Sequence, residues 1–121
     1  MNQININFDN NHAMTFYSEY LRKNIMIIIS DELEASEEDL TFDFKNKISL
    51  FINNISKWYP PVCQGIIDWV KSTYDISINL VDIELMIIYI LFEQVENALF
   101  GLDFRLSVDI EHGCGVQLSL Q

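Results

Sequence analysis

The chain has 121 residues, of which 18 are acidic and seven are basic, and its formal net charge is −11. A charge of this size disfavours nucleic acid and anionic membranes as partners, because phosphate groups need clustered lysine and arginine, and it favours basic proteins. Half of the residues are apolar, so a chain of this length can build its own core, and one domain spanning residues 1–121 is predicted.

The N-terminal part of the chain predicts mostly helix. Ile4, Ile6 and Phe8 alternate with polar residues and indicate a short strand. In residues 14–23 the apolar side chains recur at helical spacing, with the charged ones largely away from them. Residues 25–29 are all apolar and fit a buried strand as well as a helix. A continued helix is favoured because the apolar positions of both segments stay on one face.

A strongly acidic segment follows, in which six of nine residues are carboxylates. A solvated loop leading into a helix is one interpretation of such a run, and a surface that faces a partner is the other. The six carboxylates are Asp31, Glu32, Glu34, Glu37, Glu38 and Asp39.

The central part of the chain predicts helices. Residues 40–44 alternate and indicate a brief strand or an extended lead into a helix, which then runs through residues 48–58 with a clear 3.6-residue period. Pro60 and Pro61 are expected to end that helix and to start a second one, with a buried face in residues 66–74. The aromatic residues around the prolines (Trp58, Tyr59 and Trp69) are expected in the core, although an exposed one would suit an interface.

Three apolar runs end the chain, at residues 83–92, 100–108 and 116–120. Their lengths and the polar, glycine-bearing segments between them predict an antiparallel meander. A helix over residues 82–99 is the competitor, because Asp82, Glu93, Glu96 and Asn97 would share one side of it and Gly101 could end it. The predicted fold class is α+β, with a helical N-terminal and central part packed on a C-terminal antiparallel meander of about three strands.

The turn at residues 109–115 gathers the side chains best suited to chemistry. Structural zinc needs four ligands from spaced pairs, and no second pair is present. A nucleophilic Cys–His pair needs contact between thiol and imidazole together with an orienting third group. We expect a hairpin loop in which the two glycines adopt positive backbone dihedrals. The residues concerned are Asp109, Glu111, His112, Gly113, Cys114 and Gly115.

No catalytic residue, metal or cofactor is therefore predicted. A small metal-dependent or thiol-dependent enzyme that uses the turn is the alternative hypothesis. The N-terminal residues lack the features of a secretory signal, and the longest apolar run is too short to span a bilayer. Cys63 and Cys114 have no paired spacing, so a reduced, cytoplasmic protein is expected.

Residues 82–93, 99–105 and 109–116, together with the size and charge of the chain, carry a resemblance to a known group. The chain resembles the small acidic immunity proteins of bacterial polymorphic toxin systems, including contact-dependent growth inhibition loci. The resemblance implies a cytosolic inhibitor that binds and neutralises a cognate toxin C-terminal domain, a basic protein and often a nuclease. It carries over no catalytic residues. Excess carboxylates would suit a basic toxin surface, and residues 31–39 are expected to take part in the contact. A regulatory subunit whose partner is not a toxin is a further alternative.

Overall fold

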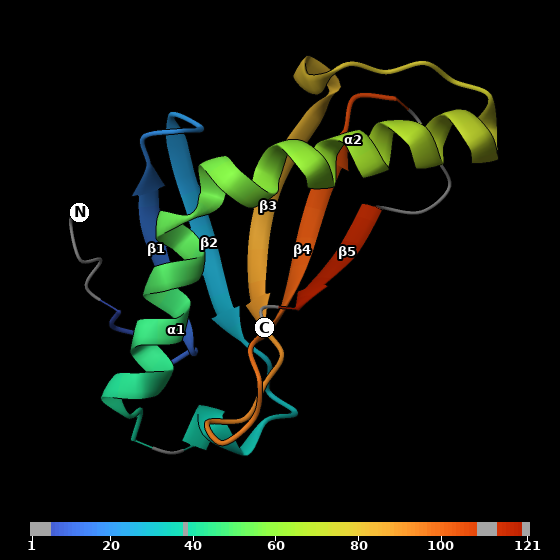
Figure 1. Ribbon diagram of the computed structural model, residues 1–121. Coiled ribbons are helices and arrows are strands. Elements are labelled where there is room, and N and C mark those ends of the chain that lie inside the picture. The colour runs from blue at the N-terminus through green and yellow to red at the C-terminus, as the bar shows by residue number, and fades with distance from the viewer. Residues whose placement is uncertain (1–5, 38, 109–113, 120–121) are drawn as a thin grey trace.

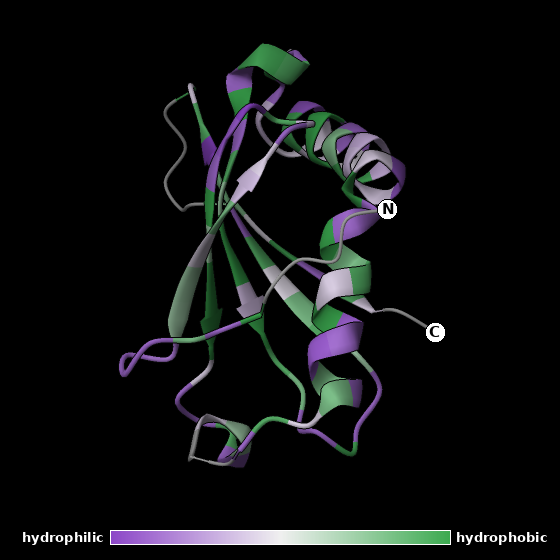
Figure 2. Ribbon diagram, turned by 90° about the vertical axis from the view of Figure 1, so that its left-hand side faces the viewer, coloured by the Kyte–Doolittle hydropathy of each residue, from purple (hydrophilic) through white to green (hydrophobic). Residues whose placement is uncertain are grey.

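The computed structural model describes residues 6–37, 39–108 and 114–119. Five strands form one sheet in the order β1-β2-β3-β4-β5, and the two α-helices lie on one of its faces (Figures 1 and 2). The predicted α+β class is confirmed. The elements are β1 (Ala13–Ser18), β2 (Lys23–Ile29), the 3-10 helix η1 (Glu34–Glu37), α1 (Phe42–Asn53), α2 (Ile55–Tyr74), the 3-10 helix η2 (Leu80–Asp82), β3 (Ile83–Ile90), β4 (Leu99–Leu106) and β5 (Cys114–Ser119).

The sheet is mixed, because its central pair runs in parallel. β1 and β2 form an antiparallel hairpin, and β3, β4 and β5 form the antiparallel meander that the sequence predicts. β2 and β3 are parallel neighbours, with Ile29 opposite Ile90. A parallel pair needs a long crossover, and α1 and α2 together provide it. The meander is thus one part of a larger sheet.

The helix expected in residues 14–29 is wrong. This segment forms β1 and β2, in which Phe16, Ile25, Ile27 and Ile29 alternate toward the helices and are buried. The connecting turn closes through the N–H of Arg22, which donates to the carbonyl of Ser18 at 2.7 Å. The helical spacing misled because it counted tyrosines that the structure leaves exposed, so the period-two burial of the isoleucines decides the conformation.

One shorter strand prediction also fails, and in the other the strand gives way to its alternative, an extended lead into a helix. Residues 6–8 belong to no strand, although Ile6 is buried, and Ile4 lies outside the described residues. Phe42 and Phe44 lie in the first turn of α1 and not in a strand. Thr41 has an extended backbone, and its hydroxyl accepts a hydrogen bond from the N–H of Phe44 at 3.1 Å. This side-chain cap starts the helix directly after the extended segment.

Pro60 and Pro61 lie inside α2 and do not end a helix. The break falls earlier, at Asn54, which separates α1 from α2. Both prolines are exposed, and so are Ser56 and Lys57, whose carbonyls lose a helical donor four residues later. Water can reach these carbonyls, and the helix therefore tolerates the two prolines. None of the described helices is long and apolar enough to cross a membrane.

The core lies between the helices and one face of the sheet. Phe51 of α1 stacks on Phe100 of β4 with ring centroids 3.8 Å apart, and on Trp58 of α2 at 4.5 Å. The helix competitor for residues 82–99 is wrong, since β3 and the start of β4 occupy this range. Neither of the α-helices in the described residues covers the opposite face of the sheet (Figure 2), where Tyr17 and Met26 are exposed.

Candidate functional site

The parallel β2–β3 pair brings two distant loops together. Neighbouring parallel strands end at the same edge of a sheet, so the segments that follow them start side by side. The N–H of Ser30, directly after β2, donates to the carbonyl of Ile90 at 3.2 Å. Residues 30–37 and 39–41 consequently lie next to residues 91–98 at the lower end of the molecule in Figure 1.

Glu93 joins the two loops most directly. Its carboxylate oxygens accept hydrogen bonds from the N–H groups of Glu34 and Ala35, both at 3.0 Å. These groups open η1, where backbone donors have no partner within the helix. The carboxylate of Glu96 in turn accepts from the N–H of Glu93 at 2.7 Å. Carboxylates therefore hold the acidic segment in its conformation by satisfying its backbone.

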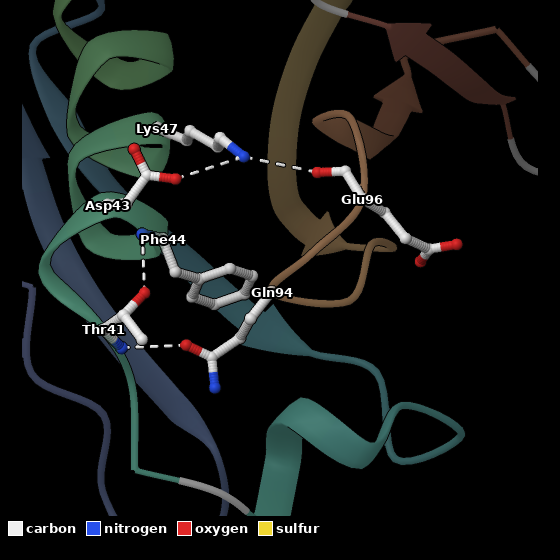
Figure 3. A network of polar contacts seen from close by, with 6 residues as sticks. All are labelled: Thr41, Asp43, Phe44, Lys47, Gln94 and Glu96. Carbon is white, nitrogen blue, oxygen red and sulfur yellow. Dashed lines mark hydrogen bonds and ion pairs between the residues drawn. The ribbon is translucent and has the colours of Figure 1, made fainter.

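A second set of contacts ties both loops to α1 (Figure 3). The side-chain oxygen of Gln94 accepts from the N–H of Thr41 at 2.8 Å, and its nitrogen donates to the carbonyl of Asp39 at 3.1 Å. Lys47 reaches the carboxylate of Asp43 at 3.4 Å and the carbonyl of Glu96 at 3.3 Å. The amide of Gln94 and the ammonium group of Lys47 thus connect the two loops to α1 within a region rich in negative charge.

We call the result the acidic end. It includes four of the predicted carboxylates, together with Asp43 and Glu96 from other segments, and all six are exposed. Glu37 is the last residue of η1, and Glu38 lies outside the described residues. The acidic end consists of Asp31, Glu32, Glu34, Asp39, Asp43 and Glu96.

Most carboxylates of the acidic end have no cationic partner among the described residues. Among the residues that the structure describes, Asp43 alone of the six takes part in a salt bridge. Elsewhere, Glu84 lies 2.6 Å from the ammonium of Lys23, and this hydrogen bond and charge lower the pKa of Glu84. Unpaired surface carboxylates keep their negative potential available to cations in solution, and that is the chemistry this end of the molecule can perform.

The turn at residues 109–115 is described only in part. Asp109, Glu111, His112 and Gly113 lie outside the described residues, so their predicted roles are untested. Cys114 and Gly115 belong to β5. The positive dihedral expected at Gly115 is wrong, because no described glycine has a positive φ. In a strand, Gly115 adopts the extended backbone that any residue can adopt.

Neither thiol is activated. Cys63 and Cys114 are buried and unpaired, and burial raises the pKa of both. The negative charge of Asp103 raises that of Cys114 further, while a hydrogen bond with Tyr59 partly offsets the effect at Cys63. A reactive cysteine needs the opposite shift. Within residues 6–37, 39–108 and 114–119, no cluster of three or more His, Cys, Asp or Glu side chains could hold a metal ion.

The three aromatic residues around the prolines divide between core and surface. Trp58 is buried, and its indole N–H donates to the carbonyl of Phe51 at 2.8 Å. Tyr59 is half-buried and contacts Phe104. Trp69 is 41% exposed, contrary to the expectation that it belongs to the core. Its exposure agrees with the alternative, in which an aromatic side chain is available at the surface.

Comparison of the chain with protein-family models, with curated proteins and with solved structures gave no match.

Proposed function

We propose that this protein is an immunity protein, which binds a basic toxin domain through its acidic end and neutralises it. The supporting observation is that two loops, far apart in sequence, lie side by side and bring six exposed acids to one end of the molecule, with a single salt bridge among them in the described structure. That the partner is a toxin is inferred from the resemblance to immunity proteins. That recognition is electrostatic is inferred from the negative charge of the chain. Toxin nucleases hold phosphate and so present basic surfaces that carboxylates complement.

Charge also suits the kinetic demand on such an inhibitor. A net charge of −11 attracts a cationic domain over a distance and raises the association rate, and the effect weakens as salt is added. The acidic end is also held in place before binding, by Glu93, Gln94 and Lys47. A surface that is ordered in advance loses less conformational entropy when the complex forms.

The test is co-expression with the toxin domain encoded beside this chain. We expect the two proteins to co-purify and the complex to lack toxin activity. In the purified complex, Glu34→Lys should lower the association rate constant about tenfold at low salt and flatten its dependence on salt. The position is suitable because Glu34 is exposed and contributes only its backbone N–H to the loop contacts.

Glu19→Lys is the matched control. It changes the net charge by the same amount, but Glu19 lies in the β1–β2 turn, at the opposite end of β2 from the acidic end. If both reversals slow association equally, overall charge steers the partner and the acidic end is not the contact. If the two proteins do not associate, the function is a different one.

A further inference from the structure

β5 is an edge strand whose free side is available for pairing. It pairs with β4, and no other described strand pairs with it. The N–H of Leu91 donates to the carbonyl of Leu99 at 3.0 Å, so alternate residues of β4 beginning with Leu99 direct their backbone groups toward β3. The other alternate residues of β4, beginning with Phe100, therefore direct their backbone N–H and C=O groups toward β5. By the register of this pair, the N–H and C=O groups of Gly115 and Gln117 point to the free side of β5.

A groove of about 350 Å³ lies between this strand and α2. From α2, its lining comprises Val62, Gly65, Ile66 and Trp69, and from β5 it comprises residues 114–116. These side chains are apolar, and the exposed ring of Trp69 borders the groove. An apolar groove beside a free strand edge is the arrangement by which proteins bind an extended peptide: the edge supplies backbone hydrogen bonds, and the groove receives every second side chain.

Gly65 keeps this groove open. A glycine within a helix weakens it relative to alanine, so its presence in the middle of α2 needs a reason. A Cβ added at Gly65 would meet no atom within 4 Å, so no contact with the part of the chain that the structure describes requires a glycine there. The missing side chain instead leaves room beside Trp69 and Val62 for a group from outside.

The opposite face of β5 offers a carboxylate. Gly115 pairs with Asp103 on the sheet face away from the helices, and a Cβ added at Gly115 would also meet nothing within 4 Å. Asp103 and Gly115 line a hollow of about 510 Å³, and no salt bridge within the described residues includes Asp103. A strand added next to β5 would lie roughly 10 Å from β4, so its lysine or arginine opposite Gly115 can extend over the glycine to this carboxylate.

We propose that the β5 edge and its groove bind an extended segment of a cationic partner protein, which adds a strand to the sheet. Its apolar side chains enter the groove under Trp69, and the alternate basic side chains turn toward Asp103. A second copy of this chain does not fit, because two molecules of charge −11 repel each other. That the partner is the toxin rests on the function proposed above, whereas the docking mode does not.

The other edge of the sheet is less suitable. The hollow beside β1 is lined in part by Glu19, Asn53 and Ser56, whose polar groups would lose water if an apolar side chain entered. The groove beside β5 has mainly apolar walls and needs no such desolvation. We therefore assign strand addition to β5.

The first test uses two synthetic peptides of about eight residues, the length of a typical strand. In one, valine and lysine alternate; in the other, the same residues are grouped in two blocks. Near physiological salt we expect the alternating peptide to bind about tenfold more tightly, to change the fluorescence of Trp69 and to slow hydrogen exchange at Gly115 and Gln117. Equal affinity for the two peptides would overturn the proposal, since simple charge attraction does not depend on the order of residues.

Two variants test the geometry. Gly65→Leu fills the groove and also favours the helix, so we expect about tenfold weaker binding of the alternating peptide with no loss of thermal stability. Gln64→Leu is the control, because it adds the same side chain one residue away at an exposed position that does not line the groove. Gln117→Pro removes an outward N–H, a change that an edge strand tolerates, and should also weaken binding. Unchanged binding by Gly65→Leu overturns the proposal.

The toxin domain then separates this inference from the proposed function. If the toxin binds, Glu34→Lys slows association more than Glu19→Lys, and Gly65→Leu and Gln117→Pro both weaken the complex, both proposals hold. If the toxin binds equally well to both variants, the function stands and the toxin does not use the β5 edge, whose docking mode is then decided by the peptide test alone. If the alternating peptide binds as expected but the toxin does not, the docking mode holds and the partner is another cationic protein.

Discussion

The Glu93 carboxylate binds the backbone N–H of Ala35 at 3.0 Å, across 58 positions of sequence. A residue after β3 thereby fixes the first turn of η1, which is the next element after β2. The acidic segment thus has a defined conformation although its own side chains repel one another. Its order comes from a contact with the neighbouring loop.

We expect Glu93→Ala to lower the free energy of unfolding by about 1–2 kcal/mol, because a partly exposed carboxylate loses hydrogen bonds to two backbone donors. Urea denaturation measures the loss, and hydrogen exchange at Glu34 and Ala35 should accelerate. Glu32→Ala is the control: this carboxylate is exposed in the same loop, and its removal should change stability by less than about 0.5 kcal/mol. Equal effects of the two variants would refute the bracing role of Glu93.

Trp58→Phe should destabilise the junction between α1 and α2 by about 1–3 kcal/mol, since the buried carbonyl of Phe51 loses its indole donor at 2.8 Å. The substitution keeps an aromatic ring against Phe51. Trp69→Phe serves as the comparison at an exposed site and should stay within about 0.5 kcal/mol of the wild-type protein. Chemical denaturation of both variants checks this, and a similar loss in each would contradict the prediction.

Pro60→Ala should stabilise the protein by about 1–2 kcal/mol. Alanine restores the N–H that can bond to the carbonyl of Ser56 and favours the helix by roughly 3 kcal/mol over proline, while the unfolded chain gains some freedom. Urea denaturation checks the prediction: the midpoint of unfolding should rise while the slope of the unfolding free energy against urea concentration stays the same. A lower midpoint would mean that the proline ring makes a stabilising contact on the outer side of α2.

Asp82→Asn should lower the thermal midpoint at neutral pH, with a deficit that shrinks in acid. Asp82 accepts from the N–H of Asn79 at 2.9 Å and from the hydroxyl of Ser107 at 2.6 Å, and these bonds, in that order, lower its pKa. Its stabilisation is therefore fully present above the ordinary value of 3.8 and is lost as pH falls through the lowered value. A deficit that stays constant from neutral to strongly acidic pH would show that the charge of Asp82 plays no part.

Both cysteines should react slowly with iodoacetamide near neutral pH, because they are buried and burial raises their pKa. Mass spectrometry after timed labelling locates any modified thiol, and urea-unfolded protein provides the fully reactive reference. Labelling of Cys114 in the folded protein at a rate near that of the unfolded reference would support the alternative of a thiol enzyme.

The sequence predicted the meander because its signals are local. Each of β3, β4 and β5 is a compact apolar run bounded by polar residues, and such a pattern can be recognised without knowledge of distant contacts. The hairpin of β1 and β2 was missed because Tyr17 and Tyr20 matched a helical stripe, although the folded chain leaves both exposed. Periodicity records which residues are apolar and not which ones the fold buries.

The acidic segment was visible in the sequence, but its partners were not. Glu93 and Glu96 entered the sequence analysis only as one side of a competing helix, and Asp43 belonged to a different predicted element. They join residues 31–39 only through the parallel pairing of β2 with β3, which links segments about sixty positions apart and leaves no local signal. Since β2 was expected to be helical, that pairing could not be inferred. The groove beside β5 likewise needs the tertiary position of α2.

The parallel contact between β2 and β3 also sets the order in which a ribosome can complete this sheet. The hairpin of β1 and β2 leaves the exit tunnel early. At that stage Ile25, Ile27 and Ile29 are not yet covered by the two helices, and β2 is not yet paired with β3. Until β3 has been synthesised, one side of β2 is an unpaired strand edge that is prone to aggregation. A nascent chain stalled within α2 is therefore the form of this protein that is most in need of a chaperone.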